Sequence, residues 1–345
     1  MELTPRASRG ATIALVRNAL AGLLFLIAPS LLCAATVNDA RGRMGSQFEI
    51  TAVHPDPARA QAAIDSAYAE IDRIEALISE WRATSEISAV NRAAGDHPVA
   101  VSADTFELIR RSQKVSQLTN GAFDITWLSV GRLWDMKATH PEKPSQEAIE
   151  AALKDTGYRH VVLDATARTV YLDRPDTKIG FGGIGKGYAA NRAAHVLRDA
   201  GVSGGIVNAS GDLLAFGTRE DGAAWRIGIA DPFHRDQTFA YIDLVNQAIA
   251  TSGDYERFVV IDGKKYSHIL DPRTGYPSEE LRSVTIICPD AELADALATG
   301  VTVLGVERGL ALVNRLKDVH AFLVDSEGKI HQSKRLPTLL ERTEK

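Results

Sequence analysis

Cysteine, methionine and aromatic residues are scarce in this sequence of 345 residues, which has two cysteines, three methionines and an aromatic content of 6%. An excess of one charge is also missing, since 39 basic and 44 acidic residues leave a formal net charge of -5. No local basic patch stands out, so a nucleic-acid partner is not indicated. A hydrophobic content of 45% with 24% charged residues excludes disordered and collagen-like chains and predicts a globular protein.

The first 35 residues differ in character from the rest of the chain. Three arginines precede an apolar run from Ala19 to Leu32, and the small residues Ala34 and Ala35 follow it. This pattern predicts a secretory signal peptide over residues 1–35 and a periplasmic location. The run is shorter than the roughly 18 to 20 residues that a spanning helix needs, so a retained membrane anchor is less favoured.

The two cysteines carry little functional weight. Cleavage after about Ala35 would remove Cys33 and leave Cys288 without an intramolecular disulfide partner. Cys33 raises the alternative of a lipoprotein, but the bulky Leu32 stands where a lipid-attachment site has a small residue. Cys288 ends an apolar run, which favours a buried, inert thiol over a nucleophile.

Helical and strand patterns alternate irregularly after the signal segment. Apolar spacing predicts helices over Ala58–Ser79, Ala103–Leu118, Gln146–Leu153, Tyr188–Ala200, Ala291–Leu304 and Arg308–Leu316. Strands are expected over Met44–Val53, near Val161–Leu163 and Val170–Leu172, and over Arg257–Ile261, Lys264–Leu270 and Ala321–Val324. Asp262-Gly263 is a strong hairpin signal between two of these strands. Without repeats or long linkers, the pattern predicts one compact α+β unit.

A glycine-rich turn reads Gly-Phe-Gly-Gly-Ile-Gly-Lys-Gly from Gly180 to Gly187, just before a predicted helix. Free backbone N–H groups at a helix start, together with Lys186, suit a phosphate group. Two nucleotide-binding patterns fit the stretch incompletely. The dinucleotide fingerprint lacks its acidic residue at the end of a following strand, and Gly187 stands where a P-loop needs Ser or Thr. A tight strand-to-helix turn would explain two or three of the glycines, so phosphate binding is the better interpretation of all five.

A second candidate site follows the predicted hairpin. His268 is close to the end of a strand, and Asp271 and Arg273 lie in the turn beyond it. A histidine can accept a hydroxyl proton near neutral pH, and an arginine can bind phosphate with two parallel hydrogen bonds. The alternative is a structural histidine followed by good turn chemistry, because Asp, Pro and Gly all favour turns.

Asp295 and Thr299 lie four residues apart in a predicted helix, so their oxygens share one face. One carboxylate and one hydroxyl suit a hard cation that also binds water and phosphate oxygens. The alternative is a structural role, in which the Asp caps the helix and the Thr hydroxyl bonds back to its own helix. If these two residues are considered without other evidence, the structural role is favoured.

Together these segments resemble the ApbE family, and the resemblance runs from about Met44 to the last strand. It is carried by Met44-Gly45-Ser46, by Trp81, Ser85 and Asn91, by Gly121 to Thr126 with Leu133-Trp134, by Lys186-Gly187-Tyr188-Ala189, by Thr251 to Tyr255, by the His268 loop, and by Asp295 to Thr299 with Leu304-Gly305. The resemblance implies an α+β domain over residues 40–340, with mixed, mostly antiparallel sheets packed against helices and a flavin site in a cleft between them.

The family activity implied is FAD:protein FMN transfer, in which a Thr or Ser hydroxyl of a target flavoprotein takes FMN from FAD and AMP leaves. By resemblance, FAD contacts Met44, Trp81, Ala122, Phe123, Asp124, Gly180, Lys186 and Ile269. Asp295, Thr299 and the main-chain oxygen of Gly183 would hold magnesium, with His268 as the base and Asp271 and Arg273 beside it. Contact with a membrane is expected only through the target protein.

Several positions depart from the family pattern. Gly180 and Asn191 each replace a commonly acidic residue, so one ribose or adenine contact is expected to be missing or mediated by water. Ala209-Ser210-Gly211 replaces a more usual double-glycine turn before Asp212, and the proline frequent after Asp124 is missing. Two alternatives to transfer stay open: hydrolysis of FAD to FMN and AMP, and flavin binding without turnover. A role in thiamine synthesis finds no matching chemistry in these residues.

Overall fold

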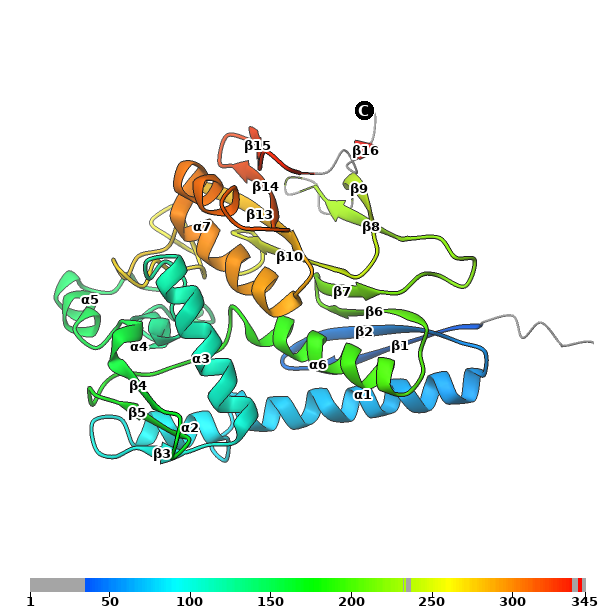
Figure 1. The fold of residues 1–345 in the computed structure, drawn as a ribbon. Coiled ribbons are helices and arrows are strands. Elements are labelled where there is room, and N and C mark those ends of the chain that lie inside the picture. Colours follow the sequence, from blue (N-terminus) through cyan, green and yellow to red (C-terminus); the bar gives the residue numbers. More distant parts are fainter. Residues whose placement is uncertain (1–34, 232, 234–236, 337–340, 343–345) are drawn as a thin grey trace, which may run out of the picture. The chain divides into compact units, whose positions relative to one another are not determined.

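A long antiparallel sheet organises the protein, as shown by a computed structural model that describes residues 35–231, 233, 237–336 and 341–342 (Figure 1). Its strand order is β1-β2-β6-β7-β10-β13-β14-β15, and adjacent strands are antiparallel. The strands are β1 (Ala35–Arg43), β2 (Ser46–His54), β6 (Gly204–Ala209), β7 (Asp212–Phe216), β10 (Gln247–Gly253), β13 (Leu281–Cys288), β14 (His320–Asp325) and β15 (Ile330–Gln332).

Three helices cover one face of this sheet: α1 (Pro57–Ile78), α6 (Gly185–Asp199) and α7 (Ala291–Val313). The other face packs against a smaller sheet with the order β16-β9-β8, which contains β8 (Trp225–Ala230), β9 (Thr238–Leu244) and β16 (Glu341–Arg342). Each central strand therefore alternates between two apolar layers. In β2, Ile50 and Ala52 belong to the helix-side core, whereas Val53 packs with Trp225 and Ile229 of β8.

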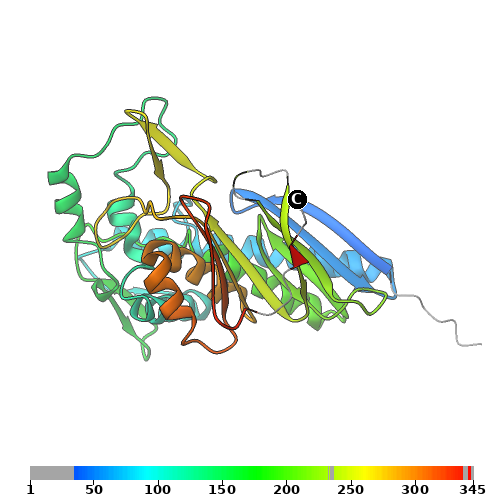
Figure 2. The ribbon, with the colours of Figure 1, turned by 90° about the horizontal axis from the view of Figure 1, so that it is seen from above.

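Smaller elements flank the end of α1. They are α2 (Glu86–Arg92), α3 (Ala103–Leu118), η1 (Ile125–Trp127), α4 (Leu128–Gly131), α5 (Gln146–Leu153), η2 (Tyr158–His160) and the sheet of β3 (Val99–Ala100), β5 (Thr169–Leu172) and β4 (Val161–Asp164). A separate hairpin joins β11 (Phe258–Ile261) to β12 (Lys264–Ser267) through Asp262-Gly263. Figure 2 shows this hairpin projecting away from the central sheet.

Helix α1 illustrates how local sequence signals build the fold. The Asp56 side chain accepts a hydrogen bond of 2.9 Å from the Ala58 N–H, and Pro57 occupies the first turn, where its missing N–H costs nothing. Apolar residues at helical spacing, among them Ile64, Ile71 and Ile74, are fully buried against the sheet and α6.

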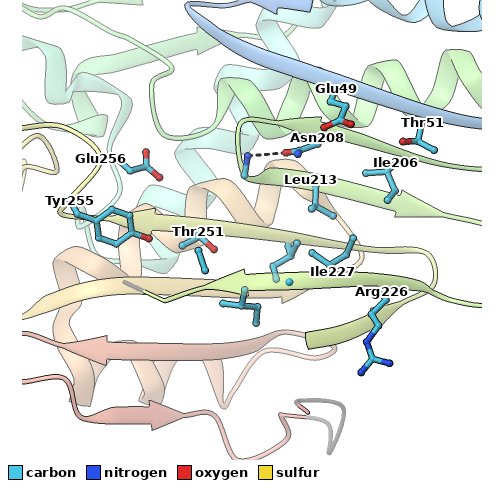
Figure 3. A pocket seen from close by; sticks show the side chains of 15 residues that line it. Glu49, Thr51, Ile206, Asn208, Leu213, Arg226, Ile227, Thr251, Tyr255 and Glu256 are labelled. Carbon is cyan, nitrogen blue, oxygen red and sulfur yellow. Dashed lines mark hydrogen bonds between the residues drawn. The ribbon is translucent and has the colours of Figure 1, made fainter. Parts of the chain in front are cut away.

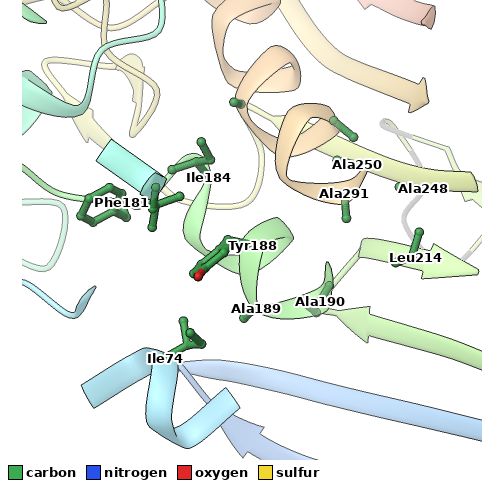
Figure 4. Packing of buried hydrophobic residues seen from close by; sticks show 14 of the residues in the cluster. Ile74, Phe181, Ile184, Tyr188, Ala189, Ala190, Leu214, Ala248, Ala250 and Ala291 are labelled. Carbon is green, nitrogen blue, oxygen red and sulfur yellow. The ribbon is translucent and has the colours of Figure 1, made fainter. Parts of the chain in front are cut away.

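Small residues let α6 approach its neighbours closely. Figure 4 shows Tyr188 and Ala189 of α6 toward Ile74 of α1, and Ala190 toward Leu214 of β7. At Gly187 a Cβ would collide with the Ala291 carbonyl at the start of α7. The absence of a side chain at this position therefore brings the N-termini of α6 and α7 together, and the site described below depends on that contact.

The α+β class is confirmed, but several predicted boundaries are wrong. Met44 does not begin a strand, because Met44 and Gly45 have φ values of 51° and 70° and form the turn between β1 and β2. The strand expected over Lys264–Leu270 ends at Ser267, and the helix expected from Tyr188 begins at Gly185.

The two helices expected over Ala291–Leu304 and Arg308–Leu316 form α7, which has a break at Gly305, where φ is 78°. Helix α7 is long and apolar enough to cross a membrane by length and composition, but it packs against the central sheet and α6 as a core helix.

The predicted signal peptide, including Cys33, lies outside the described residues except for Ala35, which begins β1. Cys288 is fully buried, and burial raises the pKa of its thiol to about 12. This environment agrees with the inert role expected for it.

Candidate active site

The glycine turn meets α7 at the two residues predicted to bind metal. The Gly187 N–H donates a hydrogen bond of 3.0 Å to Asp295 Oδ2. A Cβ on Gly183 would lie 2.7 Å from Thr299 Oγ1, so the backbone of the turn passes directly beside that hydroxyl. The turn and the helix are more than a hundred residues apart in the sequence. The fold thus brings Gly183 of the turn close to Asp295 and Thr299 of the helix.

Lys186 lies in the same cluster. Its Nζ is 2.5 Å from Asp212 Oδ2, at the start of β7, and the second Asp212 oxygen accepts a hydrogen bond of 3.3 Å from the Thr251 N–H of β10. Burial opposes the charge on Lys186, but the Asp212 and Asp295 carboxylates outweigh it and raise the pKa of the lysine above its ordinary value. Lys186 is therefore a fixed positive charge beside the turn.

Asp295 is 4% exposed. Burial raises the pKa of its carboxyl group above the ordinary value, and the neighbouring Asp212 raises it further. Asp295 and Asp212 thus lie near the single ammonium group of Lys186 in a buried place, and the raised pKa favours the neutral form of Asp295. A bound divalent cation would favour its ionised form.

His268 follows directly after β12, and its orientation is fixed by Arg257, the residue before β11. Both its backbone N–H and its Nδ1 lie 3.0 Å from the Arg257 carbonyl oxygen. With Nδ1–H donating to that carbonyl, the lone pair of Nε2 is the one left to accept a proton. Burial lowers the pKa of His268, and the charges of Arg257 and Lys186 lower it further. The hairpin that carries His268 follows β10 along the chain, and the Thr251 N–H of β10 donates to Asp212, the partner of Lys186.

Asp271 and Arg273 form an ion pair within their own turn. Arg273 Nε and Nη2 each donate a hydrogen bond of 2.8 Å to the Asp271 carboxylate, and the Arg273 N–H donates a third of 2.9 Å. The aliphatic part of Arg273 lies 3.7 Å from where a Gly121 Cβ would stand. The structure therefore places this pair against the loop that begins at Gly121, and its part in the chemistry stays a prediction.

The loop after α3 is held by Asp124. This buried carboxylate accepts hydrogen bonds from the Thr126 N–H (2.8 Å), Thr126 Oγ1 (2.7 Å) and the Tyr158 N–H (2.5 Å). Ala122 and Phe123 are also buried, and Phe123 packs where a Cβ of Gly300 would be, one residue after Thr299. The predicted flavin contacts at residues 122–124 thus adjoin the metal pair, with the Asp124 side chain occupied in holding the loop.

Three further residues predicted to contact the flavin are Met44, Trp81 and Ile269. Met44 Cε lies 3.7 Å from the position of a Gly185 Cβ. Trp81 is 78% exposed, which is unusual for so large an apolar side chain. Ile269 is buried beside His268, and the Ser278 N–H donates a hydrogen bond of 2.9 Å to its carbonyl.

The two departures from the family pattern have different surroundings. Gly180 leaves space that Glu80 approaches, since a Cβ there would lie 3.0 Å from Glu80 Oε1. Burial raises the pKa of the Glu80 carboxyl group. Asn191 instead serves the start of α7: its Nδ2 donates to Asp290 Oδ1 and its Oδ1 accepts from the Ala291 N–H, both at 3.0 Å. Asn191 therefore positions the helix that carries Asp295.

Sequence reasoning missed Asp212 and Glu80 as members of the site. Asp212 is 26 residues from Lys186, and only the pairing of β6 with β7 brings it to the turn. The sequence signal that could have identified Asp212 was the turn before it. Ser210 and Gly211 have positive φ in this turn, and Asp212 follows them at the start of β7. Glu80 gave no signal beyond its position before the exposed Trp81.

The residues at the turn fit a divalent cation. In the described part of the chain, no three His, Cys, Asp or Glu side chains come together as a metal cluster. The donors expected for it are the Asp295 carboxylate, the Thr299 hydroxyl and the Gly183 main-chain oxygen. This all-oxygen set suits magnesium, which takes few protein ligands and keeps water or substrate phosphate oxygens.

Comparison with known proteins assigns the chain to a family. The sequence model of the ApbE family matches residues 44–323. This chain belongs to the ApbE family. It is 33% identical over 304 residues to a Klebsiella pneumoniae protein named FAD:protein FMN transferase, which covers 86% of this chain and 85% of the relative. A protein of the same name from Escherichia coli K12 is 32% identical over 294 residues, covering 83% of each chain.

Solved structures of ApbE proteins share the fold. The ApbE protein of Thermotoga maritima superposes with a TM-score of 0.83 at 32% identity, covering 89% of this chain and all of the other. The flavin transferase ApbE of Vibrio cholerae gives a TM-score of 0.79 at 29% identity, covering 87% of this chain and 98% of the other. The ApbE match therefore spans nearly all of the described residues.

Proposed function

We propose that this protein is an FAD:protein FMN transferase, which moves FMN from FAD to a Thr or Ser hydroxyl of an acceptor flavoprotein. The observation that carries the proposal is the contact between the N-terminus of α6, which holds Lys186, and the Asp295–Thr299 face of α7. His268 follows the hairpin after β10, and the Thr251 N–H of β10 donates to Asp212, the partner of Lys186. A helix N-terminus and a fixed lysine bind a diphosphate, and a nearby imidazole can take a proton from the attacking hydroxyl.

The reaction follows from these positions. The acceptor hydroxyl attacks the phosphorus on the FMN side of the diphosphate, and the bond from that phosphorus to the oxygen of AMP breaks. The hydroxyl proton passes to His268 Nε2, and AMP leaves with the bridging oxygen. Lys186 and the N–H groups of the turn balance the charge on the diphosphate oxygens, an electrostatic contribution that dominates phosphoryl transfer.

Magnesium is proposed at Gly183, Asp295 and Thr299. When bound there, it supplies positive charge to the diphosphate and orients it. Its support in this chain is the all-oxygen donor set and the burial of the Asp295 and Asp212 carboxyl groups near the single ammonium group of Lys186.

The flavin ring is proposed to lie near Trp81 and Met44. Met44 lies beside Gly185 of the turn, and Trp81 follows Glu80, which approaches Gly180. An exposed indole offers a face on which an isoalloxazine ring can stack. The loop of Ala122 and Phe123 and the backbone at Ile269 complete the contacts, while the Asp124 carboxylate contributes by fixing that loop.

A direct assay separates transfer from the two alternatives. The purified protein is incubated with FAD, MgCl2 and a synthetic library of decapeptides that each contain one threonine. Transfer predicts a fluorescent peptide adduct in amounts equal to the AMP released, and both are lost with EDTA. Release of AMP and free FMN without an adduct identifies a hydrolase, and no AMP under any condition identifies a flavin-binding protein.

We also propose that the protein acts in the periplasm, on the strength of the signal-like residues 1–35. Contact with the membrane is then made through the acceptor protein. Cell fractionation tests this location, because retention of the full-length chain in the cytoplasm contradicts it.

A further inference from the structure

A groove of about 440 Å³ lies between the central sheet and β8 (Figure 3). One wall is the sheet face that points away from the helices. It presents alternate residues of neighbouring strands, such as Glu49 and Thr51 of β2, Ile206 and Asn208 of β6, and Ile249 and Thr251 of β10. The intervening residues belong to the helix-side core, so this wall is one pleated face with an apolar floor and polar margins.

The opposite wall is the edge of a strand. Five consecutive residues of β8, residues 226–230, line the groove. Successive side chains of a strand point to opposite faces, so a surface touched by all five runs along the strand edge. Among the described strands, β8 is outermost in the order β16-β9-β8. An edge strand presents backbone N–H and C=O groups that can pair with another chain.

The groove ends at the active site. Thr251 lines it, and the Thr251 N–H donates to Asp212, the partner of Lys186. Gly211, which precedes Asp212, also lines it. Figure 3 shows Tyr255 and Glu256 at one end and Arg226 at the other. Glu256 lies five residues after Thr251, whose N–H donates to Asp212, so the Glu256 end of the groove is the one that adjoins the active site.

We infer that this groove, called here the β8 groove, binds the acceptor protein. An extended segment of the acceptor adds as a strand to the edge of β8 and delivers its Thr or Ser hydroxyl to the Thr251 end. The inference rests on the proposed transferase function. The five lining residues of β8 span about 17 Å at roughly 3.3 Å per residue, which fits a segment of about five residues. Backbone pairing provides affinity, and the floor selects side chains at alternate positions.

Steric filling of the groove tests this inference. Thr51→Trp fills it from the sheet wall and Ala230→Trp from the β8 wall, at positions that are not fully buried. Thr36→Trp is the matched control, because Thr36 is an exposed residue of the neighbouring strand β1 outside the groove. The probe is a decapeptide with one threonine, chosen from the library for adduct formation by the wild-type protein.

The groove variants are expected to raise the KM for the decapeptide by about tenfold or more. FAD affinity stays at the wild-type value, and Thr36→Trp leaves both quantities unchanged. An unchanged KM in both groove variants overturns the inference. Loss of FAD affinity in place of a higher KM also overturns it, because the groove would then hold part of the flavin nucleotide.

Hydrogen exchange on the unmodified protein provides a test that needs no variant to fold. Saturating decapeptide is expected to slow amide exchange at residues 227–229, since strand addition pairs these backbone groups. If the exchange rate at these residues is the same with and without the decapeptide, in a sample that still forms the flavin adduct, the proposed binding at the β8 groove is rejected. The transferase function is then unaffected. Failure of every library peptide to form an adduct, with AMP still released, instead rejects the transferase function.

Discussion

The backbone of Gly183 passes so close to Thr299 that a Cβ on the glycine would lie 2.7 Å from the threonine Oγ1. This contact joins the phosphate-binding turn to the helix that carries Asp295. It also explains why glycine is needed at a position where φ is not unusual: the constraint is space rather than backbone conformation.

Gly183→Ala is therefore expected to displace Thr299 and to lower turnover by about a hundredfold, since small misplacements of reacting groups have effects of this size. The measurement is kcat for adduct formation at saturating magnesium. Gly182→Ala is the matched control, because a Cβ at Gly182 would lie 3.5 Å from Trp127, an ordinary contact distance. Equal activity of the two variants contradicts the role of the Gly183–Thr299 contact.

Asp295→Asn is expected to impair metal-dependent turnover more than FAD binding. The change keeps the shape of the side chain and removes the negative charge that a divalent cation requires. The dependence of kcat on magnesium concentration is compared with the Kd for FAD. Glu307→Gln on an exposed position of α7 is the control, and it should change neither quantity. A parallel loss of binding and turnover in Asp295→Asn argues against a metal ligand at this position.

His268→Ala is expected to abolish transfer while FAD remains bound, because the base is removed without touching Lys186 or the turn. The pH dependence of the wild-type protein follows from the lowered pKa of His268. Below this pKa the imidazole is protonated and cannot accept a proton, so kcat/KM falls as the pH drops through it. Above it the neutral base prevails and the rate reaches a plateau, so the midpoint of the fall lies below the ordinary histidine value of 6.5.

The control for this experiment is His195→Ala, an exposed histidine of α6 whose side chain is 62% accessible. It should retain both the activity and the pH profile. If a partly active His268 variant still loses kcat/KM as the pH falls, a group other than His268 is responsible for the pH dependence.

Elements with strong local signals were predictable from the sequence. The helix expected over Ala58–Ser79 is α1 (Pro57–Ile78), and Asp262-Gly263 does form a hairpin, with φ values of 52° and 76°. These features depend on residues close in sequence. Strand β1 was missed and Met44 was misplaced because the turn at Met44-Gly45 needs a positive φ at a methionine, which no local pattern predicts.

The site residues that belong to local sequence motifs were predictable. Those brought together only by strand pairing were not. Lys186 and Asp295 come from recognisable segments, whereas the pairing of Lys186 with Asp212 arises when β7 passes under the N-terminus of α6. Asn191 shows the converse: expected near the nucleotide, it binds Asp290 and Ala291 at the start of α7. The β8 groove has no sequence signature, because its walls come from strands that only the sheet order brings together.

Asp124 offers a test of stability rather than of chemistry. Asp124→Ala removes the acceptor for the Thr126 N–H, the Thr126 hydroxyl and the Tyr158 N–H in a buried place. Leaving buried donors unpaired is expected to lower the free energy of unfolding by about 3 kcal/mol, measured by urea denaturation. Asp164→Ala, at an exposed turn where the carboxylate accepts from Thr166 and Ala167, should lower it by less than about 1 kcal/mol.

Because Phe123 packs against α7 beside Thr299, the FAD affinity of folded Asp124→Ala should also fall. A variant that keeps full stability but loses FAD binding would instead show that the Asp124 carboxylate contacts the flavin nucleotide directly.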